Sequence, residues 1–205
     1  MTMAGYLTEV RNAVEGLLPL IWQEQDALSG LEGQLAERKD ELARLERQVR
    51  QEYANVAWLR NNEEWDDEGI ATLRYWDNYF GPDKERYHLA QRVPEVQAAV
   101  ESLRASVEAH RFSADALAGT VIQVAKQGLA LVHGGKPSAT GRMIGSSQQL
   151  SEVIWQARNQ ALHWEDRSFN APVNNCSTKL ASEVDQVFSS YVIRNMALDV
   201  IKMLG

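Results

Sequence analysis

The sequence is poor in cysteine, and it lacks any long apolar run. Cys176 is the single cysteine among 205 residues, so the chain has no intramolecular disulfide framework and no cysteine–histidine cluster for structural zinc. No basic segment followed by a long apolar run opens the sequence, and no stretch approaches the roughly 18 uncharged apolar residues of a membrane span. We therefore expect a cytoplasmic protein with no membrane span, no metal site and no cofactor.

Positive charge is also in short supply. A formal net charge of −7 argues against a protein that coats nucleic acid indiscriminately, because phosphate binding normally needs clustered Lys and Arg. Acidic residues are nevertheless absent between Asp115 and Glu152. This window contains His133 and three weak candidates for RNA contact, namely Lys126, Lys136 and Arg142. The window indicates either a local positive field or a helix end and polar loop that happen to lack acids.

No stretch alternates apolar and polar residues as a half-buried strand does, whereas helical spacing is extensive. Sixteen positions from Leu7 to Leu59 follow a 3-4 step; thirteen are Leu, Val or Ile, and Glu24, Arg38 and Glu52 are the exceptions. A second seam with the same step runs from Leu89 to Leu131. Two such seams predict two long helices that fold back on each other as an antiparallel coiled-coil hairpin.

A glycine-rich segment after Val132 separates the second long helix from the C-terminal region. It lacks the Gly-x-x-x-x-Gly-Lys-Ser/Thr order of a phosphate-binding loop, so we interpret it as a linker. Further helices are expected from Leu150 to near Asp166 and from about Val173 to Leu204. The expected fold is all-α, with a four-helix bundle formed by residues 1–30 and 110–205 and a coiled-coil hairpin over 31–109.

The tip of the expected hairpin, about residues 61–88, combines acids with aromatics between Glu63 and Tyr87. Exposed Trp and Tyr favour protein interfaces, so the tip is a candidate docking surface for a partner protein or an antitoxin. A small helical cap whose aromatics close the end of the hairpin explains the same composition.

The pattern Arg-Asn-x-x-x-His, formed by Arg158, Asn159 and His163, lies in the expected third helix. Chance supplies about 0.015 such patterns in a chain of this composition. A helical wheel places Asn159 and His163 well away from the apolar stripe of that helix. Trp155 and Leu162 are bulky residues that the stripe does not accommodate, so they are weak candidates for a dimer interface.

These residue types suit cleavage of RNA without metal. Histidine ordinarily has a pKa of about 6.5, which suits moving the proton of a 2′-hydroxyl or of the leaving oxygen. The planar guanidinium of Arg158 can grip a phosphate with two hydrogen bonds and stabilise the anionic transition state. Asn159 can orient the imidazole, hold a phosphate oxygen, or be a solvated surface amide.

With this motif on the third helix of a four-helix bundle, the chain resembles the HEPN superfamily, which includes RNA-cleaving toxins and anti-phage effectors. The resemblance implies a homodimer or pseudo-dimer in which two copies of Arg158, Asn159 and His163 meet across a cleft. It also implies metal-independent endoribonuclease cleavage that leaves a cyclic phosphate. His163 would be the general acid/base, Arg158 the phosphate clamp and Asn159 the orienting residue. In one branch, paired with nucleotidyltransferase antitoxins, a tyrosine lies two positions after the histidine. Here Glu165 stands there, so we do not expect that mode of control.

A different class of function fits the same sequence. The long seams and the tip are typical of a catalytically silent helical scaffold, or of a sensor subunit, that binds a protein partner. In that case the motif would only stabilise a dimer.

Overall fold

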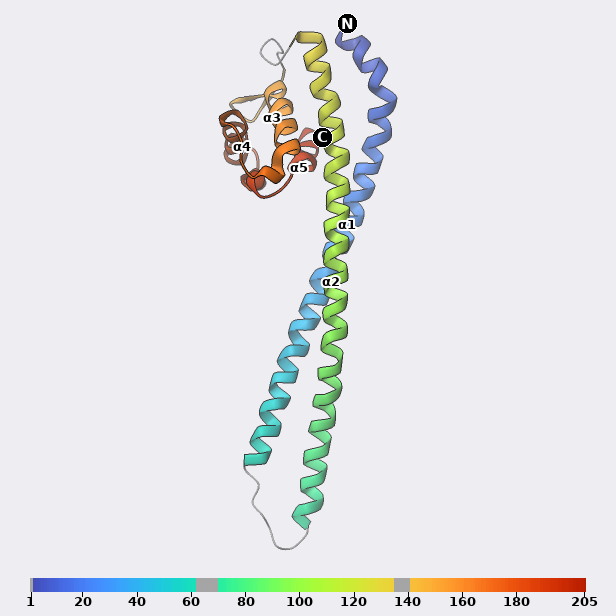
Figure 1. Ribbon diagram of the computed structural model, residues 1–205, viewed down its shortest axis with the longest axis vertical. Helices are drawn as coiled ribbons and strands as arrows, with labels where there is room; N and C mark the ends of the chain where they lie inside the picture. Colours follow the sequence, from blue (N-terminus) through green and yellow to red (C-terminus); the bar gives the residue numbers. More distant parts are fainter. Residues whose placement is uncertain (1, 62–69, 135–140) are drawn as a thin grey trace. The chain divides into compact units, whose positions relative to one another are not determined.

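The computed structural model describes the backbone of residues 2–61, 70–134 and 141–205, and the side chains of 2–54, 84–134 and 141–205. The protein is mostly helical, with two long helices and a small helical C-terminal region (Figure 1). It divides into two compact units. Unit 1 comprises Met1–Leu28 and Ala109–Gly205, and unit 2 comprises Ser29–Glu108.

The two long helices, α1 (Met3–Asn61) and α2 (Ile70–His133), pack antiparallel, which confirms the predicted hairpin. In unit 2, Arg92 donates from Nη2 to Glu41 Oε1 at 3.3 Å. In unit 1, the Tyr6 hydroxyl donates to the carbonyl of Val124 at 2.7 Å. Residues early in α1 therefore meet residues late in α2. The helix α1 runs without a break through Pro19, so this proline does not start a new helix.

The apolar seams are the contact faces of the two helices. Leu35, Leu45, Val96 and Val100 are buried in unit 2. In unit 1 the polar residue of the first seam, Glu24, meets the histidine of the second, His110, with 2.7 Å between Oε2 and Nδ1. His110 is therefore a paired seam residue, as its position in the heptad pattern predicts.

Tyr6 packs directly against the backbone of α2 at Gly128. A Cβ atom added to Gly128 would lie 2.6 Å from Cε1 of Tyr6. A side chain at position 128 would therefore force the tyrosine ring to shift.

A short β-hairpin precedes the third helix, and no sequence pattern predicted it. Strands β1 (Met143–Ile144) and β2 (Gln148–Gln149) pair antiparallel. Glu183 fixes the connecting turn: its carboxylate accepts hydrogen bonds from the Ser146 and Ser147 amides, at 2.8 and 3.0 Å, and from Ser147 Oγ at 2.6 Å. These bonds lower the pKa of Glu183. Strands of two residues are too short to show alternation, so tertiary contacts decide this element.

Helix α3 spans Leu150–His163 and is followed by a single 3₁₀ turn, η2 (Trp164–Asp166), close to the predicted end of the helix. The prediction of one long final helix from Val173 to Leu204 is wrong. The structure has α4 (Ala171–Glu183), a 3₁₀ segment η3 (Gln186–Val192) and α5 (Ala197–Leu204) instead.

Side chains explain why the final helix is divided. The Asp185 carboxylate accepts the Val187 amide at 2.8 Å, which caps η3 and competes with continued helix. The side chain of Gln160 binds the carbonyls of Tyr191 and Arg194, both at 2.8 Å, and accepts the Met196 amide at 3.0 Å. The buried side-chain amide of Gln160 on α3 therefore pairs with backbone groups that a continuous helix would have paired internally.

Unit 1 has one apolar core to which α1, α2, β1 and the C-terminal elements all contribute. Helices α3, α4 and α5 lie beside the C-terminal part of α2 (Figure 1). Its buried residues include Ile21, Ala114, Ala118, Ile122, Ile144, Val153, Ala157, Cys176, Leu180, Phe188, Leu198 and Val200. The acidic and aromatic tip between Glu63 and Tyr87 lies mostly outside the described side chains; Tyr87 itself is exposed.

Candidate functional site

Arg158, the expected phosphate clamp, is half-buried at the boundary between α3 and α2. Its Nε donates to Oε1 of Gln123 on α2 at 2.7 Å. A single bond through Nε fixes the direction of the side chain and leaves the two terminal nitrogens of the guanidinium without a partner among the described residues. These terminal nitrogens are the part of an arginine that binds phosphate in bidentate fashion.

Lys126 of α2 joins Arg158 in the same place. Its ammonium nitrogen lies 4.4 Å from the ring centroid of Trp155 on α3, a cation–π geometry. Burial, followed by repulsion from the charge of Arg158, lowers the pKa of Lys126. Neither side chain forms a salt bridge with a carboxylate in the described part of the chain. We call Lys126 and Arg158 the cationic pair.

Asn159 does not contact the imidazole of His163. Its Nδ2 donates to Oε1 of Gln156 at 3.4 Å, and Gln156 in turn donates to Oε1 of Glu152 at 2.8 Å. Asn159 therefore belongs to a row of polar side chains along α3. A role in orienting the imidazole finds no contact to support it.

His163 is the last residue of α3, and its side chain is 58% exposed. The Nδ1 atom lies 3.3 Å from Oδ2 of Asp166, which is itself 68% exposed. The wheel's expectation that His163 points outward is thus met. The polar side chain in contact with the imidazole is therefore Asp166, not Asn159.

The structure brings some predicted residues together and leaves others apart. Lys126, Arg158 and Trp155 form one cluster, and Leu162, 56% exposed, lies on the outer face of α3. Arg142 is engaged elsewhere, because its Nη2 donates to the Leu204 carbonyl at the end of α5, at 3.2 Å. Lys136 lies outside the described residues.

Arg158 and His163 do not converge within one chain. His163 is five helical positions after Arg158, which separates them by about 140° around the axis and about 7.5 Å along it. Each side chain has a different neighbour, Gln123 for the arginine and Asp166 for the histidine. Neither neighbour was predicted from the sequence. The spacing His163-x-x-Asp166 at a helix end was a readable signal, whereas the packing of α2 on α3 was the only pointer to Gln123.

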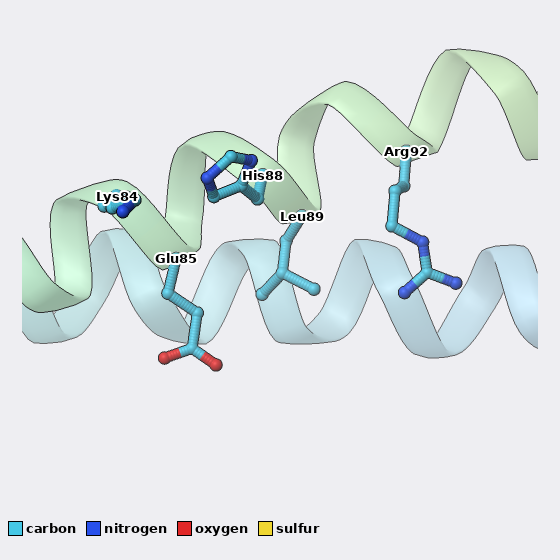
Figure 2. A pocket seen from close by; sticks show the side chains of 5 residues that line it. All are labelled: Lys84, Glu85, His88, Leu89 and Arg92. Atoms are coloured by element: carbon cyan, nitrogen blue, oxygen red, sulfur yellow. The ribbon is translucent and has the colours of Figure 1, made fainter.

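Unit 2 has a shallow groove of about 370 Å³ on α2, lined by Lys84, Glu85, His88, Leu89 and Arg92 (Figure 2). Lys84, His88 and Arg92 recur every fourth residue and so share one side of the helix. Arg92 is held by Glu41 of α1, and Leu89 points toward α1 (Figure 2). The groove is therefore an open surface of the helical hairpin, with one of its three basic groups already paired.

Among residues 2–54, 84–134 and 141–205, no three His, Cys, Asp or Glu side chains gather as metal ligands do. None of the helices in these ranges is long and apolar enough to cross a membrane. Comparison of the chain with protein-family models, curated proteins and solved structures finds no match.

Proposed function

We propose that unit 1 is a metal-independent, HEPN-like endoribonuclease that acts as a homodimer, in the manner of a toxin or an anti-phage effector. The cationic pair is the observation that carries this proposal. Lys126 and Arg158 come from two helices, lie close enough to repel each other, and have no carboxylate partner among the described residues. Such a pair favours an anion, because a bound phosphate relieves the repulsion.

The proposed proton-transfer group is His163. His163 lies on the same helix as Arg158, about 7.5 Å further along the axis, and its imidazole is exposed. In the proposed reaction, a histidine takes the proton of the 2′-hydroxyl as its oxygen attacks phosphorus. The bond from phosphorus to O5′ then breaks, and a second proton donor protonates O5′. The products are a 2′,3′-cyclic phosphate and a 5′-hydroxyl.

A second copy of the chain completes the site. Within one chain, Arg158 and His163 flank the outer face of α3 instead of meeting. The exposed Leu162 lies on that face, and Trp155, seven residues earlier, packs against Lys126 of α2. Pairing of this face in two chains would supply the second histidine and bury Leu162. The finer architecture, a HEPN-like four-helix bundle in unit 1, is part of the same proposal.

The test is cleavage of a structured RNA in the presence of a chelator. His163→Ala should lower cleavage by about 10²- to 10⁴-fold, the usual contribution of a general acid or base. Arg158→Ala and Lys126→Ala should each weaken it at least about tenfold, because each removes a charged phosphate contact. The matched controls are His88→Ala and Arg11→Ala, which remove an exposed histidine and an exposed arginine elsewhere.

Two outcomes would contradict the proposal. Equal behaviour of the wild type and the three site variants would exclude cleavage at this site. A strictly monomeric protein in sedimentation analysis would leave each His163 without the partner site that the reaction requires. Binding at several salt concentrations adds a direct check, since Lys126→Ala should reduce the number of released counterions by about one.

The alternative is a helical scaffold that binds a protein partner through exposed apolar side chains. Large apolar side chains stand exposed on unit 1, including Phe112 at 67%, Ile193 at 66% and Leu131 at 62%. Exposed apolar groups of this size are characteristic of interaction surfaces when they form a patch. RNA cleavage that depends on His163 would decide for the nuclease.

A further inference from the structure

The 3₁₀ turn that follows α3 returns the chain toward the imidazole of His163. Arg167, in the left-handed conformation with φ 52°, ends this turn, and its amide binds the Trp164 carbonyl at 3.2 Å. As a result Asp166 Oδ2 lies 3.3 Å from Nδ1 of His163. The adjacent acid, Glu165, has no bond to the imidazole in the described structure.

The identity of the nitrogen that faces the carboxylate matters for the chemistry. A neutral imidazole carries one proton, and the hydrogen bond made by one nitrogen decides which nitrogen carries it. An ionised carboxylate only accepts hydrogen bonds, so it favours the tautomer with the proton on Nδ1. In that tautomer Nε2 carries a lone pair that can accept a proton.

From this geometry we infer that Asp166 is a positioning residue, which fixes the tautomer of His163 so that Nε2 is the atom that accepts the proton of the substrate hydroxyl. The inference rests on the proposed nuclease function for its consequence in catalysis. It replaces Asn159 as the orienting residue, since the amide of Asn159 binds Gln156. Asp166 does not itself touch the RNA; it acts through the imidazole.

The experiment follows the imidazole nitrogens of His163 directly, by long-range ¹H–¹⁵N correlation at a pH where the ring is neutral. The chain has four histidines, so His163→Gln assigns the signal by its loss. Asp166→Ala should move the population from the Nδ1–H toward the Nε2–H tautomer, by roughly 2- to 10-fold in their ratio. Asp166→Asn should keep most of the Nδ1–H form, because the amide oxygen can still accept. Glu165→Ala removes a neighbouring acid of equal charge and should change nothing.

Cleavage of RNA by the same variants gives the second reading. Asp166→Ala should lower the rate roughly 2- to 10-fold, Asp166→Asn less, and Glu165→Ala not at all. A tautomer ratio unchanged in Asp166→Ala would overturn the inference, even if the protein cleaves RNA. A shifted ratio in a protein whose wild type does not cleave RNA would support the positioning role of Asp166 and refute the nuclease alone.

Discussion

Replacement of Asp115 by asparagine should stabilise the protein at neutral and alkaline pH. Asp115 lies on α2 and is 7% exposed, with Oδ1 lacking any hydrogen-bond partner among the described residues. Burial raises the pKa of this carboxyl to about 6; the nearby Leu198 amide lowers it, Asp199 raises it, and Arg194 and Arg111 lower it. Burial therefore disfavours the ionised form of the Asp115 carboxyl.

The sign follows from proton linkage. A carboxyl whose pKa is 3.8 in the unfolded chain and about 6 in the fold binds its proton more tightly when folded. The resulting stabilisation is fully present below pH 3.8 and is lost as the pH rises through 6. Over that window the loss amounts to at most about 3 kcal/mol. Asparagine mimics the neutral acid, so Asp115→Asn should avoid the loss.

Urea unfolding at a series of pH values from about 4 to about 8 measures this effect. At about pH 8 the variant should exceed the wild type by up to about 3 kcal/mol, and the two should converge near about pH 4. Asp26→Asn, a change at an exposed acid of α1, should stay within about 0.5 kcal/mol throughout. If Asp115→Asn is less stable than the wild type at the alkaline end, attraction by Arg194 and Arg111 outweighs burial, and the reasoning is refuted.

Two further changes test packing in unit 1. Gly128→Ala should destabilise the protein by about 1–3 kcal/mol in thermal or urea unfolding, because its Cβ would lie 2.6 Å from Cε1 of Tyr6; in Tyr6→Ala the same change should cost much less, and equal costs would show that the ring moves aside. Glu183→Ala should speed hydrogen exchange of the Ser146 and Ser147 amides. In the wild type, these amides should lose protection from exchange as the pH falls below 4.5, because the pKa of Glu183 is lowered in the fold. Exchange that is unchanged by the mutation would show that the turn is held by its own backbone.

The long helices were predictable because their information is repeated. The heptad pattern places apolar residues at the same helical positions turn after turn, so isolated exceptions such as Glu24 and Arg38 do not obscure it. The C-terminal region carries no such repetition. Its helix breaks depend on a side chain from another element, Gln160, whose bonds to the η3 segment could not be inferred from local sequence.

Some features of the candidate site could likewise be predicted from the sequence, and others depend on tertiary packing. The outward direction of His163 follows from the helical wheel, and the acid-free window directed attention to Lys126. The partner of Arg158 depends on how α2 packs against α3, so Gln123 was not foreseeable. The contact between Asp166 and His163 follows from their spacing of three residues at the helix end, but the Arg-Asn-x-x-x-His pattern points to Asn159 instead.

The contact between Glu24 and His110 has a consequence for how the helical hairpin is aligned. If α1 slid by one heptad in one direction, Glu24 would face Leu117, and in the other direction His110 would face Leu17. In each shifted alignment the Glu24 carboxylate or the His110 imidazole faces a leucine, whereas in the native alignment these two polar groups face each other. The Glu24–His110 pair therefore favours one register of α1 against α2 over those shifted by a heptad.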